Sequence, residues 1–193
     1  PRTVPCTASL ERERRRYKEC DMPEIAIVVG NPNPNSRTRE AAEHLAKRIA
    51  TLSGLPIAPT IDLIDHADGL FQWQSPALEE LTARVAASRL AIFASPTYKA
   101  SYTGLLKAFL DRYPTHGLSG VTAVPLFTMG SPHHTLAVEF TLRPLLVELA
   151  ASTPTSGLSL DTSDYDQWDA ALEKWVDRHR DVLNAVLGTP AAG

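Results

Sequence analysis

The segment Glu24-Ile-Ala-Ile-Val-Val-Gly-Asn-Pro-Asn-Pro-Asn-Ser36 decides the fold of this chain. It begins with a short run of apolar, mostly β-branched residues, which is typical of a strand buried on both faces of a parallel sheet. The run stops at Gly30 and a loop of asparagine and proline. Ser36 then suits the N-cap of a helix, because apolar residues recur at helical spacing from there up to Gly54. The segment predicts a strand, a loop and a helix in succession.

The rest of the chain repeats this alternation of strand and helix. Further strands are predicted at residues 57–63, 90–94, 121–127 and 156–160, and further helices at 76–88, 104–112, 135–151 and 165–187. The last helix places on one apolar stripe Trp168, Leu172, Trp175, His179 and Val182. Strands that alternate with helices predict an α/β fold with a doubly wound sheet.

Composition favours one domain of ordinary kind. The chain has 193 residues, 44% of them apolar and 21% charged, with a formal net charge of −3. We expect a flexible N-terminal extension at 1–22, the folded domain at 23–188 and a C-terminal tail at 189–193. The extension mixes basic and acidic residues, and the remaining chain is acidic without a basic, aromatic-studded face. No nucleic-acid partner is therefore expected.

Cysteine usage and hydropathy point to a cytoplasmic protein. Cys6 and Cys20 form no CxxC pair and no cluster with histidine, which argues against a disulfide framework and against a metal site. The longest apolar runs fall far short of the roughly 20 residues that a membrane-spanning helix needs. We expect no membrane association and no bound metal.

The loops at 30–38, 95–107 and 128–134 follow the first, third and fourth predicted strands, where doubly wound sheets bind ligands. The first loop brings amides, hydroxyls and Arg37 to a helix N-terminus, which attracts phosphate. It matches neither GxGxxG nor GxxxxGK[ST], so a monophosphate suits it better than a dinucleotide or a P-loop ligand. From the residues alone, Ser36 as a simple cap and Arg37 as a solvated side chain are equally good interpretations.

The second loop, Ser95-Pro-Thr-Tyr-Lys-Ala-Ser-Tyr-Thr-Gly-Leu-Leu-Lys107, carries a resemblance to a family. It is similar to the P-x-Y-x-x-S-[YFI]-[ST]-G-x-[LF]-K pattern of the NAD(P)H-dependent FMN reductases. The resemblance extends over residues 24–152 and is greatest to the reductases of alkanesulfonate utilisation, which supply reduced flavin to a separate monooxygenase. It implies a flavodoxin-like, five-stranded parallel sheet in the order 2-1-3-4-5 with helices on both faces.

The resemblance also implies which residues bind FMN. They are Asn31, Asn33, Ser36, Arg37 and Thr38 in the first loop, Pro96, Thr97, Tyr98 and Ser101 in the second, and Thr128, Met129, Gly130 and Ser131 in the third. The first group would hold the phosphate and the others the ring. Asn33 stands where the family has arginine, so one cationic contact is lost and weaker FMN binding is expected. Met129 replaces a glycine of the family pattern.

The implied reaction is hydride transfer from NADPH or NADH to the N5 atom of the flavin, followed by delivery of reduced FMN to a partner monooxygenase. No side chain need act as an acid or base, so we name no catalytic residue. His133 and His134 are adjacent and do not form a zinc pair. The family implies a homodimer or homotetramer, and Phe140 occupies the position of a tyrosine that creates a π-bulge at a tetramer interface.

Two alternatives share the flavin loops. A quinone or azo reductase with prosthetic FMN would differ only in its second substrate, and nothing in the sequence excludes it. A flavodoxin-type electron carrier would bind FMN without nicotinamide chemistry. It is less favoured, because flavodoxins are strongly acidic and lack the second-loop pattern.

Overall fold

The computed structural model describes residues 24–188 and consists of a single five-stranded parallel sheet. The strands are β1 (Ile25–Val29), β2 (Ile61–Asp62), β3 (Leu90–Pro96), β4 (Thr122–Met129) and β5 (Leu158–Asp161). Their order across the sheet is β2-β1-β3-β4-β5, and each neighbouring pair is parallel. The doubly wound fold and the strand order are the predicted ones. The extension, the tail and both cysteines lie outside the described residues.

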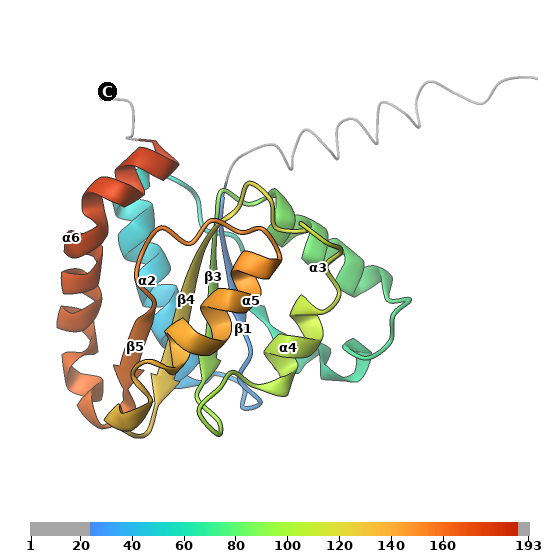
Figure 1. Cartoon of the computed structure of the whole chain (residues 1–193), viewed down its shortest axis with the longest axis horizontal. Helices are drawn as coiled ribbons and strands as arrows, with labels where there is room; N and C mark the ends of the chain where they lie inside the picture. The colour runs from blue at the N-terminus through green and yellow to red at the C-terminus, as the bar shows by residue number, and fades with distance from the viewer. Residues whose placement is uncertain (1–23, 189–193) are drawn as a thin grey trace, which may run out of the picture.

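Helices cover both faces of the sheet (Figure 1). The α-helices are α2 (Arg37–Ser53), α3 (Pro76–Ala87), α4 (Gly104–Leu110), α5 (Arg143–Glu148) and α6 (Trp168–Leu187). Shorter turns of helix are η1 (Leu63–Gly69), η2 (Pro132–His134), η3 (Val138–Leu142) and η4 (Thr162–Gln167). Helices α2 and α6 cover one face, and α3, α4 and α5 cover the other. None of the helices among residues 24–188 combines the length and apolar character needed to cross a membrane.

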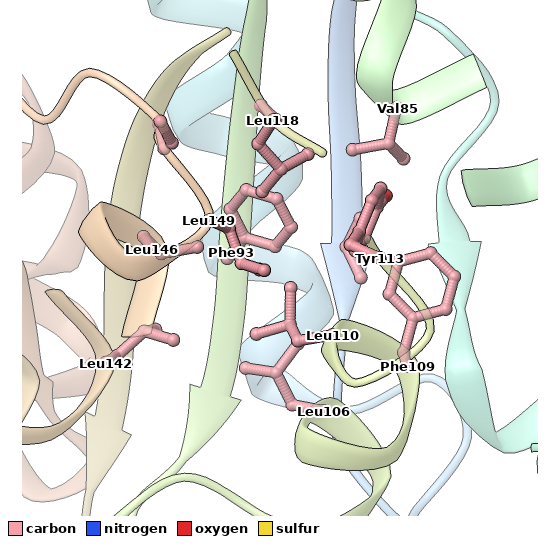
Figure 2. Packing of buried hydrophobic residues seen from close by; sticks show 14 of the residues in the cluster. Val85, Phe93, Leu106, Phe109, Leu110, Tyr113, Leu118, Leu142, Leu146 and Leu149 are labelled. Carbon is pink, nitrogen blue, oxygen red and sulfur yellow. The ribbon is translucent and has the colours of Figure 1, made fainter. Parts of the chain in front are cut away.

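The strands bury both faces, which explains their continuous apolar sequences. Successive side chains of β1 alternate between two core clusters: Ile25 and Ile27 pack toward α2 and α6, whereas Ala26 and Val28 pack toward the opposite layer. In that opposite layer Phe93 of β3 lies in one cluster with leucines of α4, α5 and the segments beside them, and with the rings of Phe109 and Tyr113 (Figure 2). The loops are therefore mounted on a core that is packed on both sides.

The predicted second strand is shorter in the structure. Residues 57–63 were expected to be extended, but only Ile61 and Asp62 pair with β1. Ile57 forms an isolated bridge to Ile25. Pro59 lies between these two pairings and has no N–H to donate, so the ladder does not run through it.

The helix predicted at 135–151 is interrupted. A π-helical turn, η3, precedes α5, and the N–H of Arg143 donates to the carbonyl of Val138, five residues earlier. Pro144 lacks the N–H that a regular α-helix would direct at the carbonyl of Phe140, which gives the wider turn its cause. The π-bulge that the resemblance implies around Phe140 is thus present.

The apolar stripe of the last helix is confirmed only in its first half. Trp168, Leu172 and Trp175 are buried. Farther along, His179 and Val182 are only half-buried, and the buried positions are Leu183 and Leu187. The buried positions shift gradually around α6 relative to the predicted stripe, because the predicted spacing differs slightly from the 3.6-residue period of the helix.

A proline in the middle of β4 is tolerated because β4 is not yet paired with β5 at this position. The N–H of Ala123 donates to Ser152 on the β5 side, so Pro125, two residues later, faces the same side. Pairing with β5 begins only at Leu126, opposite Leu158. Pro125 therefore occupies a position where no neighbouring strand requires a donor.

Phe93 tests how far this core supports the fold. Its side chain is completely buried, so Phe93→Ala should lower the free energy of unfolding by about 3–5 kcal/mol, measured by urea denaturation. Phe71 is 79% exposed and provides the matched control, for which Phe71→Ala should change stability by less than about 0.5 kcal/mol. Equal losses from the two substitutions would contradict the assignment of the core.

Candidate functional site

The three loops predicted to bind a ligand meet at the carboxyl edge of the sheet, the lower edge in Figure 1. Thr128, at the end of β4, joins them. Its hydroxyl lies 2.6 Å from that of Thr38 on α2. Its carbonyl accepts a hydrogen bond of 2.8 Å from the N–H of Thr97, just after β3. The structure thus brings together one residue from each of the predicted groups.

The first loop is shaped by its own side chains. Asn31 is only 7% exposed, and its Oδ1 accepts from the N–H of Asn33 at 2.9 Å. Its Nδ2 donates to the hydroxyl of Thr38 at 2.9 Å. The side chains of Asn31 and Thr38 are therefore engaged inside the loop, whereas Asn33 is exposed. Asn31 and Thr38 thus hold the loop in shape.

The start of α2 offers donors to an anion. Ser36 is the N-cap, and its Oγ accepts from the N–H of Arg39 at 3.3 Å. The hydroxyl of Ser36 keeps its own proton to donate. The N–H groups of Arg37 and Thr38, at the first helical positions, have no partner within the helix. Because these donors stand at the positive end of a 17-residue helix, negative charge is stabilised there.

The two arginines at the start of α2 differ in whether they form ion pairs. Arg39 is already ion-paired, because its Nε lies 2.8 Å from the Glu43 carboxylate and its guanidinium lies 3.6 Å from that of Asp62. Burial raises the pKa of Asp62, at the end of β2, above its ordinary value. Within residues 24–188, Arg37 forms no ion pair, and its guanidinium lies 4.9 Å from the ring centre of Tyr165. Arg37 is therefore the cation available to a ligand.

The second loop contains a tight turn without glycine. Tyr98 and Ser101 exchange backbone hydrogen bonds of 2.9 and 3.1 Å. Between them Lys99 and Ala100 have φ angles of 51° and 62°, the positive values that type I′ turns require and that glycine and asparagine adopt more easily. The turn leaves the Tyr98 side chain 48% exposed. An aromatic face is thus presented beside the loops.

The same loop is attached to the end of β1. The hydroxyl of Thr103 donates to the carbonyl of Gly30, and its N–H donates to Ser95 Oγ at 3.0 Å. A side chain at position 30 would begin with a Cβ only 2.6 Å from that of Leu106, so the close approach of β1 and α4 requires glycine. These contacts fix the distance between the first and second loops.

A buried hydroxyl without a partner lies in this region. Thr97 Oγ1 is inaccessible to solvent and has no hydrogen-bond partner among the described residues. A buried polar atom left unpaired is unfavourable by about 1–3 kcal/mol. A polar group of a ligand at this edge would satisfy it. Pro96, one residue earlier, is buried as the last residue of β3.

The third loop provides open backbone. Met129 is 3% exposed, so its side chain is directed into the protein. Gly130 is exposed, and a Cβ at this position would meet no atom within 4 Å. Ser131 caps η2, accepting from the N–H of His133 at 3.4 Å. The stretch at Gly130 can therefore lie close to a flat ligand.

The residues brought together suit a flavin mononucleotide in their chemistry. The start of α2 matches a phosphate, and the orphaned hydroxyl, the exposed tyrosine and the open glycine match the polar edge and flat face of an aromatic ring. Asp62 and Tyr165 were missed by the sequence analysis. Neither belongs to a local motif, because both approach α2 from elements far along the chain. The part of the chain from 24 to 188 contains no cluster of three or more histidine, cysteine or carboxylate side chains suited to a metal ion.

Comparisons with known proteins agree with this chemistry. Residues 23–164 match the family model described as NADPH-dependent FMN reductase. The chain is 31% identical to FMN reductase (NADPH) of Escherichia coli K12, over 72% of this chain and 73% of that protein. It is 29% identical to the NADH-dependent FMN reductase SfnF of Pseudomonas putida, over 87% and 95%. A solved structure of an NADH:FMN oxidoreductase in its apo form is 30% identical, with a TM-score of 0.72 over 88% and 91%.

The hydroxyl pair of Thr38 and Thr128 can be tested by a double-mutant cycle. Thr38→Val leaves the Thr128 hydroxyl and Asn31 Nδ2 without this partner, and Thr128→Val removes one of the two hydrogen bonds of the buried Thr38 hydroxyl. Each substitution should therefore lower the free energy of unfolding by about 1–3 kcal/mol. The double variant should lose less than the sum, by at least about 0.5 kcal/mol. Urea denaturation of the four proteins measures this. Strictly additive losses would contradict a direct bond between the hydroxyls.

Proposed function

The chain belongs to the NADPH-dependent FMN reductase family, and we propose that it reduces FMN at the edge formed by its three loops and passes the reduced flavin to a partner monooxygenase. The observation that carries the choice of site is the junction at Thr128, which holds the first and second loops in one place. Relatives named for NADPH and for NADH are about equally similar to the chain, so the proposal covers both dinucleotides.

The phosphate of FMN is proposed to bind at the start of α2. Its ligands are the hydroxyl of Ser36, the guanidinium of Arg37 and the N–H groups of Arg37 and Thr38. Asn31 supports them by holding the loop, and Asn33 adds a neutral contact. The support for this assignment is that Arg39 is already engaged by Glu43 and Asp62, whereas no carboxylate within the described residues pairs with Arg37.

The ring is proposed to lie between the second and third loops. When bound, FMN supplies the hydride-accepting chemistry, and the protein orients it. Thr97 Oγ1 and the backbone from Pro96 to Ser101 address its polar edge, with Tyr98 beside it. The open backbone at Gly130 and Ser131 faces its other side, and buried Met129 supports that loop from below.

Flavin is proposed to exchange as a substrate. Tyr98 is half exposed, Gly130 is exposed, and the phosphate end has one free cation among the described residues. Such an open site favours release after reduction, as delivery to a monooxygenase requires. A quinone or azo reductase with prosthetic FMN is the alternative function. The two functions differ in how long the flavin stays bound to the protein.

The protein is proposed to act as a cytoplasmic homodimer or homotetramer. Three large apolar side chains, Leu136, Phe140 and Val147, are 62%, 75% and 54% exposed along the segment from η2 to α5. Exposed apolar patches of this kind mark association surfaces. Phe140 in the π-helical turn keeps the ring of the family tyrosine without its hydroxyl.

The reaction is tested by mixing the purified protein with NADPH or NADH and free FMN under anaerobic conditions. The visible absorbance of the flavin should bleach with at least one of the two dinucleotides. Gel filtration after incubation with FMN then distinguishes the two enzymatic alternatives. A colourless protein supports FMN as substrate, and co-elution of yellow flavin supports prosthetic use. If FMN is neither bound nor bleached, the proposed function is wrong.

Arg37→Ala tests the phosphate site. A charge-assisted hydrogen bond is worth about 1.5–3 kcal/mol, so the variant should bind FMN at least about tenfold more weakly. Binding of riboflavin, which lacks the phosphate, should change little. Flavin fluorescence quenching measures both affinities. Arg180→Ala, an exposed arginine toward the far end of α6, is the matched control and should alter neither. Equal losses for both flavins would contradict the assignment.

A further inference from the structure

Tyr165 lies at the start of α2 although it belongs to the segment between β5 and α6. It is part of η4, and its ring centre is 4.9 Å from the Arg37 guanidinium. The match to the family model ends at residue 164, so Tyr165 lies just outside the matched segment. The contact between Tyr165 and Arg37 is therefore not one that the resemblance supplies.

The ring of Tyr165 packs against a buried tryptophan side chain. It packs edge-to-face on Trp168, with 5.1 Å between the ring centres. Trp168 is 5% exposed, and its indole N–H donates to the carbonyl of Asp161 at 2.7 Å. Tyr165 itself is 41% exposed, which leaves one face free for Arg37. A ring that packs on a buried tryptophan thus lies beside an exposed, charged side chain.

The hydroxyl of Tyr165 has its own partner on α2. It donates to Glu40 Oε1 at 2.6 Å. This bond raises the pKa of Tyr165 above its ordinary value, so the hydroxyl keeps its proton. Glu40 lies three residues after Arg37, a spacing at which opposite charges on a helix normally attract each other. Yet no ion pair between Arg37 and Glu40 is found in the structure. Tyr165 binds both residues instead.

We propose that Tyr165 is a positioning residue that keeps Arg37 available to the flavin phosphate, its ring holding the guanidinium and its hydroxyl holding Glu40 away from it. The inference rests on the proposed function and adds to it a residue outside the three loops. A cation over an aromatic face uses none of its N–H donors. Within the part of the chain that the structure describes, the five N–H donors of the Arg37 guanidinium therefore remain available to phosphate oxygens.

The hydrogen bond to Glu40 strengthens this arrangement. A phenol that donates to a carboxylate gains electron density, because hydrogen bonds polarise the groups they join. The ring face becomes more attractive to the guanidinium. At the same time the negative charge of Glu40, which would otherwise repel a phosphate at the start of the helix, is partly satisfied.

Substitutions at position 165 separate the ring from the hydroxyl. Tyr165→Leu removes both and should weaken FMN binding about two- to fivefold, the range expected for an exposed cation–π contact, while riboflavin binding stays unchanged. Tyr165→Phe keeps the ring and should show a smaller loss. Glu40→Gln should then strengthen FMN binding more in the Tyr165→Phe background than in the wild type, because the freed carboxylate no longer competes for Arg37.

The Arg37→Ala background distinguishes the proposed role of Tyr165 from a purely structural one. In that background, Tyr165→Leu should have no further effect on FMN affinity, because the residue through which it acts is gone. Affinities of the apoprotein for FMN and riboflavin are read by fluorescence quenching. Equal weakening of both flavins, or the same loss with and without Arg37, would overturn the inference. If the wild type binds no FMN, the proposed function itself fails.

Discussion

The hydrogen bond between the hydroxyl groups of Thr38 and Thr128 joins two elements that lie 90 residues apart in the chain. Both side chains are buried, so water cannot replace either hydroxyl as a hydrogen-bond partner. Breaking the bond would therefore lower the stability of the folded protein. Thr128 also receives the N–H of Thr97, which makes it the meeting point of the first, second and third loops. Together with the bonds from Thr103 to Gly30 and Ser95, these contacts of Thr128 fix how the three loops lie relative to one another.

Charge at the same edge is arranged by pairing. Glu43 and the buried Asp62 pair with Arg39, and Tyr165 binds Glu40, so no carboxylate among residues 24–188 pairs with Arg37. This distribution is not visible in the net charge, because the segment from 37 to 43 contains two carboxylates and two guanidinium groups. What matters for an anion is which cation lacks a partner. The fold decides this by bringing Asp62 of β2 to Arg39 and Tyr165 of η4 to Glu40.

The sequence predicted most of the fold, because parallel strands buried on both faces have continuous apolar runs and the helices between them have apolar residues at helical spacing. It failed where backbone hydrogen bonding overrides hydrophobic pattern. Pro59 shortens β2, and Pro144 produces the π-helical turn, although the surrounding residues are apolar enough to continue a strand or a helix. The candidate loops were predicted because they follow the first, third and fourth strands, and the motif in the second loop then implied a flavin as their ligand. Tyr165 and Asp62 were not, because their contacts with α2 arise only from the packing of distant elements.

The loops combine rigidity with openness, and this combination bears on how a flavin would be used. Pro32, Pro34, Pro96 and Pro132 fix φ at the corners of the loops, and the turn at Lys99 and Ala100 holds two non-glycine residues at positive φ. Such strain, about 1–3 kcal/mol per residue, persists only where neighbouring bonds determine the backbone. A loop that is already ordered loses little conformational entropy on binding, which supports affinity without enclosing the ligand. A site that stays open can release its flavin without a conformational change, and this is why the open loops favour the proposed use of FMN as an exchanging substrate.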